Sequence, residues 1–218
     1  MSTEKLPQPD RGFEDNVVDF EVARLNAEFA KLNPMQRVQK ALGLFGDDLV
    51  LATTFGPTAP FLLHLGSNIA SDITVVNIQH GYETEETKRI AQWYIDEFNL
   101  NVKVYKSPKL PIPVEGTAEF EEFQQKVKVE PFQRMIDDLQ PKAYLSGIMD
   151  WQTAERKSVP IVQRKGSVLA INPLLGLTER DIDHYLEVCN FPKNNDYFDP
   201  TKGAGQKKEC QLNTSVYR

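Results

Sequence analysis

The sequence predicts an α/β protein with a single domain, in which a mostly parallel sheet is flanked by helices. Two observations support this prediction. Short apolar runs alternate with amphipathic segments through the middle of the chain, an order typical of a parallel sheet covered on both faces. The chain also has 218 residues, 40% of them apolar, which is enough for one core. Ligands of such sheets bind at the carboxyl ends of the strands, where we expect the functional site.

Two amphipathic helices are expected before the first strand. Residues 1–10 combine charge and proline without periodicity, which indicates disorder. Apolar side chains then recur at steps of three and four from Phe20 to Leu32, and Asn33 and Pro34 end that helix. Residues 35–45 repeat the pattern. We therefore expect residues 1–45 to hold a disordered segment and helices, and residues 46–190 to form the α/β domain.

Strands and helices are expected to alternate within residues 46–190. An insertion with prolines and acidic residues interrupts them at 108–132, at the ligand-binding edge. The last helix is expected to start with Thr178 as its N-cap and Asp181 as the acid of a capping box, and Cys189 after it is expected in the core. The predicted strands are 49–55, 73–78, 102–105, 142–148 and 168–171, and the predicted helices are 58–65, 84–98 and 178–188.

Residues 191–218 are expected to form a mobile C-terminal tail with little to bury. This tail places Cys210 directly after Lys207, Lys208 and Glu209. A free cysteine is normally among the most buried residues, so a cysteine in a polar tail is unusual. Neighbouring positive charge lowers the pKa of a thiol and raises the fraction of thiolate, which is the nucleophile. Cys210 is therefore the candidate catalytic residue.

Composition and charge exclude several classes of protein. The 31 acidic and 25 basic residues give a net charge of -6, which argues against a general nucleic-acid binder. No stretch approaches the roughly 18 apolar residues of a membrane helix, and the polar N-terminus does not resemble a secretory signal. We expect a cytoplasmic protein without a membrane partner. Two cysteines can neither build a disulfide framework nor supply the thiolates of an iron–sulfur cluster, so no metal is expected.

Polar side chains gather where the predicted strands end. After the first strand, hydroxyl residues and a glycine precede a helix, which can present N–H groups and a positive dipole end to an anion. Later positions add amide and cationic donors suited to phosphate or sulfate. Ordinary caps and solvated surface charges would explain each motif alone equally well. The candidate binding residues are Thr53, Thr54, Phe55, Gly56, Thr58, Gln79, His80, Gly81, Tyr82, Lys128, Arg134, Gln152 and Arg156.

Taken in order, these motifs resemble those of the phosphoadenylyl-sulfate (PAPS) reductase family. Residues 52–56 resemble its S-S-S-F-G phosphate loop, and residues 196–202 resemble a compact form of the segment before its cysteine. Glu209, Cys210 and Leu212 resemble its C-terminal E-C-G-L-H. Three further stretches, 81–87, 128–134 and 147–156, resemble D-T-G-Y-x-F-x-E-T, K-V-E-P-x-x-R and G-x-R-R-x-Q-x-x-x-R. The resemblance implies an adenine nucleotide alpha hydrolase-like fold, with residues 46–190 binding the nucleotide.

The resemblance also implies a mechanism. The substrate, 3′-phosphoadenylyl sulfate, would bind at the sheet edge, and the Cys210 thiolate would attack its sulfur. This step gives an S-sulfocysteine and adenosine 3′,5′-bisphosphate, and reduced thioredoxin or glutaredoxin would then release sulfite. No bound cofactor is expected, and a homodimer is left open. The lack of further cysteines indicates the branch that uses PAPS, because relatives that use adenylyl sulfate carry an iron–sulfur cluster.

Departures from the family pattern keep alternatives open. Met149 and Asp150 stand where the family has two arginines, and Asn213 stands where it has a histidine. We expect the Asp150 carboxylate to repel a polyanionic substrate. One alternative is therefore a nucleotide-binding relative whose catalysis is impaired. The other is an ATP-using adenylating enzyme of the same fold, although Thr53 to Thr58 lack the S-G-G-x-D-S loop of that class.

Overall fold

The computed structural model describes residues 11–203, of which residues 11–19 are described by their backbone alone. Residues 1–10 and 204–218 lie outside the described residues, and with them lie the predicted N-terminal disorder and Cys210. Among the described residues, no helix combines the length and the apolar content needed to cross a bilayer.

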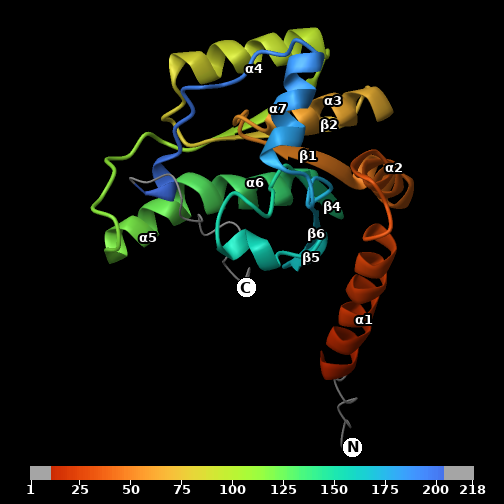
Figure 1. Ribbon diagram of the computed structural model, residues 1–218. Helices are drawn as coiled ribbons and strands as arrows, with labels where there is room; N and C mark the ends of the chain where they lie inside the picture. The colour runs from red at the N-terminus through yellow and green to blue at the C-terminus, as the bar shows by residue number, and fades with distance from the viewer. Residues whose placement is uncertain (1–10, 204–218) are drawn as a thin grey trace, which may run out of the picture.

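A six-stranded sheet with the order β3-β2-β1-β4-β6-β5 forms the centre of the molecule (Figure 1). Every neighbouring pair is parallel except β5 and β6, so the predicted mostly parallel sheet is confirmed. In the register of the sheet, Ala52 of β1 lies opposite Ser146 of β4, which brings the carboxyl ends of the two strands level. The strands are β1 Leu49–Thr53, β2 Thr74–Gln79, β3 Asn101–Lys106, β4 Ala143–Ser146, β5 Val162–Lys165 and β6 Val168–Ile171.

Helices cover both faces of this sheet, as predicted. Alternate residues of β1 point to opposite faces: Leu49 and Leu51 join one apolar cluster, and Val50 joins the other. Helices α2, α3, α4 and α7 pack on the first face, and α6 packs on the second. The helices are α1 Arg11–Phe29, α2 Pro34–Phe45, α3 Ala59–Ile69, α4 Glu85–Glu97, α5 Ala118–Gln124, α6 Glu130–Leu139 and α7 Glu179–Val188.

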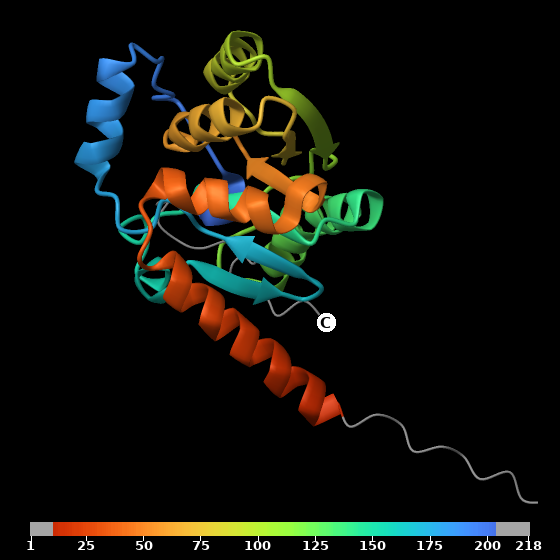
Figure 2. The same cartoon turned by 90° about the vertical axis from the view of Figure 1, so that its right-hand side faces the viewer.

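Strand β5 was not predicted, because its sequence Val-Gln-Arg-Lys has little apolar character. It forms a hairpin with β6 through Gly166, whose φ of 59° lies in the left-handed region that glycine adopts without strain. The exposed edge of β5 is partly closed by Asn26 of α1. Its side-chain amide donates to the carbonyl of Val162 at 2.7 Å and accepts from the N–H of Val162 at 2.9 Å. The first half of α1 extends away from the rest of the fold (Figure 2).

Two helix signals were predicted, one correctly and one incompletely. Thr178 caps α7 and forms the predicted capping box with Asp181. Asn33 does more than end α1, because it is also the N-cap of α2 and forms a capping box with Gln36. The predicted insertion contains a helical segment in which α5 continues through a π-helical turn at Gln125–Val129 into α6.

Two burial predictions were wrong. Residues 191–203, which we call the strap, do not lack buried groups: Asn194, Asp199 and Thr201 are each at most 2% exposed. The strap is well packed because it finds polar partners in α4, in the loop after β1, in α5 and in the π-helical turn at Gln125–Val129, and composition alone does not reveal these interactions. Cys189 is half-buried at the end of α7 and does not belong to the core.

Candidate functional site

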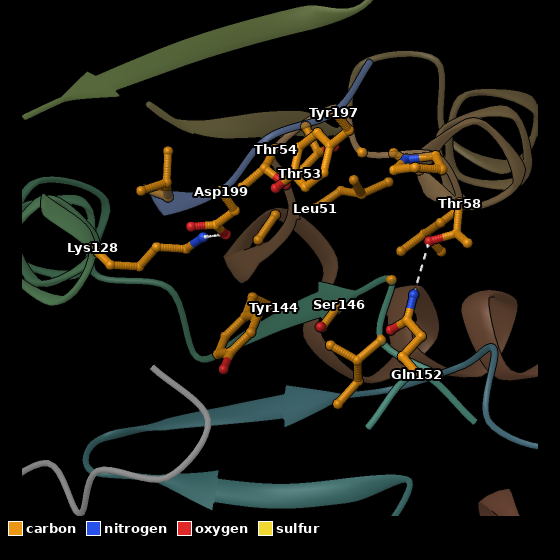
Figure 3. A pocket seen from close by; sticks show the side chains of 18 of the residues that line it. Leu51, Thr53, Thr54, Thr58, Lys128, Tyr144, Ser146, Gln152, Tyr197 and Asp199 are labelled. Atoms are coloured by element: carbon orange, nitrogen blue, oxygen red, sulfur yellow. Dashed lines mark hydrogen bonds and ion pairs between the residues drawn. The ribbon is translucent and has the colours of Figure 1, made fainter. Parts of the chain in front are cut away.

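A cavity of about 160 Å³ lies at the carboxyl ends of β1 and β4 (Figure 3). The loop between β1 and α3 forms one wall, and the end of β4 with the segment after it forms another. Lys128 and Phe132 close a third side, and the strap crosses over the top. The polar and charged lining residues are Thr53, Thr54, Thr58, Lys128, Tyr144, Ser146, Gln152, Arg156, Tyr197, Asp199 and Lys202.

The loop after β1 presents hydroxyl groups to this cavity. Phe55 has a φ of 51°, and its N–H donates to the Thr53 hydroxyl at 3.0 Å, which stabilises the turn at the strand end. The Phe55 ring itself is buried in the core. Helix α3 starts directly after Thr58, so the positive end of its dipole lies against the cavity. Hydroxyls beside a helix N-terminus form a suitable environment for a phosphate group.

Gln152 and Arg156 lie at the same corner of the cavity. Gln152 Oε1 accepts from the N–H of Met149 at 3.1 Å and from Nη1 of Arg156, which orients the amide. Gln152 Nε2 then donates to the Thr58 hydroxyl at 3.4 Å. Arg156 is only 6% exposed, yet it lines the cavity. The guanidinium is therefore held close to the N-terminus of α3, where it can add positive charge to an anion site.

Lys128 lies on the opposite side of the cavity, where the π-helical turn directs it inward. Its Nζ is 2.5 Å from Oδ2 of Asp199, and both side chains are almost completely buried. Burial alone would raise the pKa of the Asp199 carboxyl. The charge of Lys128 and the hydrogen bonds donated by Lys128 and Thr201 outweigh that effect, so this pKa is lowered and the carboxylate stays ionised.

The turn after β2 does not line the cavity. Tyr82 packs on the inserted segment, and its hydroxyl donates to the carbonyl of Leu110. Glu83 accepts the N–H groups of His80 and Gly81 at 2.8 and 3.3 Å. The predicted ligands Gln79, His80, Gly81 and Tyr82 thus lie together in this turn and are not among the residues that line the cavity.

His80 is 2% exposed and lies close to the buried Lys128–Asp199 pair. Its Nδ1 accepts the N–H of Tyr82 at 3.1 Å, which places the ring proton on Nε2 in the neutral form. Burial lowers the pKa of His80, and the charge of Lys128 lowers it further.

Arg134, another predicted ligand, is not among the residues that line the cavity. It lies exposed on α6 and donates to the carbonyl of Lys106 at the end of β3. The backbone of Phe55 forms part of the loop after β1, whereas its ring is buried in the core and does not line the cavity.

The two residues that replace the family arginines point away from the cavity. Met149 is fully buried in the core, and Asp150 lines a separate surface hollow with Trp151 and Leu177. Neither residue is among the described lining residues of the cavity, and the expectation that the Asp150 carboxylate repels a polyanionic substrate stays a prediction.

Several lining residues were missed by sequence reasoning. Tyr144 and Ser146 end β4, so the rule that ligands bind at carboxyl ends of strands could have identified them. Tyr197, Asp199 and Lys202 come from the strap, which was expected to be unstructured. The available signal was Asp199-Pro200-Thr201, because an aspartate before proline is a common cap. Asp199 indeed accepts the N–H of Thr201 at 3.1 Å.

A comparison with known protein families identifies the family of the chain. Residues 48–200 match the family model described as the phosphoadenosine phosphosulfate reductase domain. The chain belongs to this family. Within residues 11–203, no group of three or more histidine, cysteine, aspartate or glutamate side chains is arranged to hold a metal ion.

Named relatives support the same family. A phosphoadenosine 5′-phosphosulfate reductase of Synechococcus sp. is 36% identical over 181 residues, which cover 78% of each chain. One from Xanthomonas euvesicatoria is 32% identical over 77% of this chain and 73% of its own. The chain thus spans most of the length of these PAPS reductases.

Solved structures show the same fold. The crystal structure of PAPS reductase from Candida auris in a phosphate complex has a TM-score of 0.66 at 20% identity, covering 88% of this chain and 92% of its own. FMN adenylyltransferase of Candida glabrata has a TM-score of 0.57 at 12% identity, covering 81% and 66%. The chain therefore shares its fold with a PAPS reductase and with an adenylyltransferase.

Proposed function

We propose that the chain is a PAPS reductase, which reduces 3′-phosphoadenylyl sulfate to sulfite in sulfate assimilation. The observation that carries this proposal is the match to the reductase family over residues 48–200, together with relatives of that name at up to 36% identity. The cavity adds chemical support, because hydroxyls, a helix N-terminus and buried cations converge at one sheet edge. An adenylating enzyme is less favoured, since the adenylyltransferase neighbour shares only 12% identity.

In this proposal the substrate is held at the two sides of the cavity. Thr53, Thr54 and Thr58 with the N-terminus of α3 bind one phosphate, and Gln152 and Arg156 reach the anhydride beside it. Gly56 allows the nucleotide to approach the loop backbone. Gln79, His80, Gly81, Tyr82, Phe55 and Arg134 act indirectly, by supporting the walls that the lining residues stand on.

Cys210 supplies the chemistry in the first half-reaction. Its thiolate forms a bond to the sulfate sulfur while the bond from sulfur to the phosphate oxygen breaks. The leaving 5′-phosphate of adenosine 3′,5′-bisphosphate takes the electron pair, and Arg156 with the helix N-terminus stabilises its charge.

A thioredoxin or glutaredoxin thiolate then attacks the Cys210 sulfur in the second half-reaction. Sulfite leaves with the electron pair, and a second thiol resolves the mixed disulfide. Dithiol reductants are kept reduced in the cytoplasm, so we place the enzyme there. A homodimer stays a prediction, which light scattering would test.

Intact-mass spectrometry tests the first half-reaction directly. Incubation of the full chain with PAPS and no reductant should add one sulfo group, which peptide mapping should place on Cys210. Cys210→Ser should remain unmodified, because no thiolate is available for attack. Cys189→Ser is the matched control and should be modified like the wild type, since Cys189 lies at the end of α7 outside the lining residues.

The second half-reaction is tested by adding reduced thioredoxin or glutaredoxin to the modified chain. Sulfite should be released, and the original mass should return. An unmodified wild-type chain, or a sulfo group on Cys189, contradicts the proposed function. Binding of adenosine 3′,5′-bisphosphate without any sulfite would instead support the catalytically impaired relative.

A further inference from the structure

The strap connects three parts of the fold across the cavity. At its start, Asn194 Nδ2 donates to the carbonyl of Phe55 at 3.1 Å and to the hydroxyl of Thr87 at 2.9 Å. At its middle, the Tyr197 and Thr54 hydroxyls are 2.9 Å apart. At its end, Gln124 Nε2 donates to the carbonyl of Thr201 at 2.7 Å. The strap therefore runs from the loop after β1 to the inserted helix α5.

Asp199 is the most strongly held residue of the strap. Its Oδ2 receives Lys128 Nζ at 2.5 Å, and its Oδ1 accepts the N–H and the hydroxyl of Thr201 at 3.1 and 2.5 Å. Asp199 and Thr201 are both 0% exposed. A buried carboxylate needs such partners, because a charge removed from water is costly unless it is paired and hydrogen-bonded. The strap can thus occupy this position only with Asp199 and Lys128 together.

The Lys128–Asp199 ion pair gives Lys128 and Lys202 different electrostatic roles in the cavity. Lys128 faces a carboxylate, so the pair contributes little net charge to the cavity. Lys202 comes three residues after Asp199, lines the same cavity and places Nζ 5.9 Å from the centre of the Tyr197 ring. Gln152 with Thr58 lies on the other side of the cavity, away from Lys128 and Asp199 (Figure 3). Arg156, whose guanidinium donates to Gln152, supplies the cation on that side. A ligand with two separated phosphates fits a cavity that has cations at both sides.

We propose that the strap is part of the nucleotide site and that Asp199 is the positioning residue that holds it there. Through Asp199 the strap brings Tyr197 and Lys202 to the cavity, and Lys202 contacts the second phosphate of a bisphosphate nucleotide. This inference rests on the proposed function, because the nucleotide is the bisphosphate product of that reaction.

Titration calorimetry of the full chain tests the role of Asp199. Asp199→Asn should bind adenosine 3′,5′-bisphosphate about tenfold more weakly, while adenosine 5′-monophosphate should lose less than about threefold. General loosening of the fold would weaken both nucleotides equally and would overturn the proposal. Asp183→Asn on α7 is the matched control, because it removes the exposed ion pair that the strap makes through Lys193, of the same 2.5 Å length, and leaves the buried pair intact. It should bind both nucleotides like the wild type.

A second variant leaves the buried ion pair intact. Lys202→Ala should also lose about tenfold for the bisphosphate and little for the monophosphate. Lys142→Ala removes an exposed lysine that pairs with Asp48 at 2.6 Å, and it should change neither affinity. Unchanged binding by Lys202→Ala, or an equal loss for both nucleotides, overturns the inference alone. A wild-type chain that binds neither nucleotide overturns the proposed function together with it.

Discussion

Met149 stands where the family has an arginine, but its side chain is buried in the core. Replacing Met149 by arginine would restore the family residue but place a guanidinium in a site that is 0% exposed. We expect Met149→Arg to lower the free energy of unfolding by about 3 kcal/mol or more, because a buried unpaired charge is costly. Urea denaturation followed by circular dichroism measures this change.

The neighbouring position provides the control for that experiment. Asp150→Arg also introduces a guanidinium, but Asp150 is half-buried and lines a surface hollow. Its effect on the free energy of unfolding should stay within about 1 kcal/mol. If Met149→Arg is as stable as Asp150→Arg, then Met149 does not pack in the core as described.

Most predicted residues that line the cavity lie at or shortly after the end of a predicted parallel strand, and Lys128 in the inserted segment is the exception. Thr53, Thr54 and Thr58 line the cavity because strand ends meet at one edge of a parallel sheet, and this geometry can be read from the order of elements. Asp199 could not be found in that way. It acts through Lys128, 71 positions away in the chain, and no local pattern encodes such a pairing.

At the level of elements, the close approach of α3 to β1 depends on one glycine. A Cβ at Gly66 would lie 2.6 Å from Leu51 Cδ1, and Leu51 is only 1% exposed. Gly66→Ala should therefore lower the free energy of unfolding by about 1 to 3 kcal/mol through overpacking. The same substitution at Gly43 in α2 meets no atom within 4 Å and should raise it by about 0.5 to 1 kcal/mol.

Thermal or urea unfolding of the two variants gives a matched comparison, because both glycines lie in helices. A stabilising Gly66→Ala would show that α3 can move away from β1 without loss.

Elements with apolar periodicity were predictable, and elements held by polar partners were not. The five parallel strands and α7 follow from apolar runs and a capping box, which are local signals. Strand β5 depends on pairing with β6 and on the Asn26 side chain, and the strap depends on Asp199 with Lys128. These interactions join distant parts of the chain, so composition indicated loops where the structure has order.

Over the whole molecule, an acidic chain still brings a few cations together at one edge of its sheet. The net charge is -6, yet the described cavity lining contains Lys128, Arg156 and Lys202 beside the N-terminus of α3. Local charge therefore decides anion binding, because solvent and salt screen distant surface carboxylates over about 10 Å.

The stability of the whole chain should depend on two histidines, the buried His80 and the half-buried His64. Burial lowers the pKa of both His64 and His80, so the folded chain keeps them neutral below the pH at which the unfolded chain protonates them. His64 Nδ1 is 2.7 Å from the Tyr185 hydroxyl, and Phe98 stacks on its ring. The unfolded state then binds more protons than the folded state at mildly acidic pH. The free energy of unfolding must therefore fall as the pH is lowered through about 6.5, the ordinary pKa of histidine.

We expect urea denaturation at pH 8, 7, 6 and 5 to show this loss, which linkage limits to about 1.4 kcal/mol per pH unit for each histidine. His80→Gln should reduce the slope below pH 6.5, because one of the two proton acceptors of the unfolded state is gone. His184→Gln on the exposed face of α7 is the control and should keep the wild-type slope. A His80→Gln variant with the wild-type slope would show that His80 is protonated in the folded chain. The Lys128–Asp199 pair would then lie against a third charge, and its role in holding the strap would have to be reconsidered.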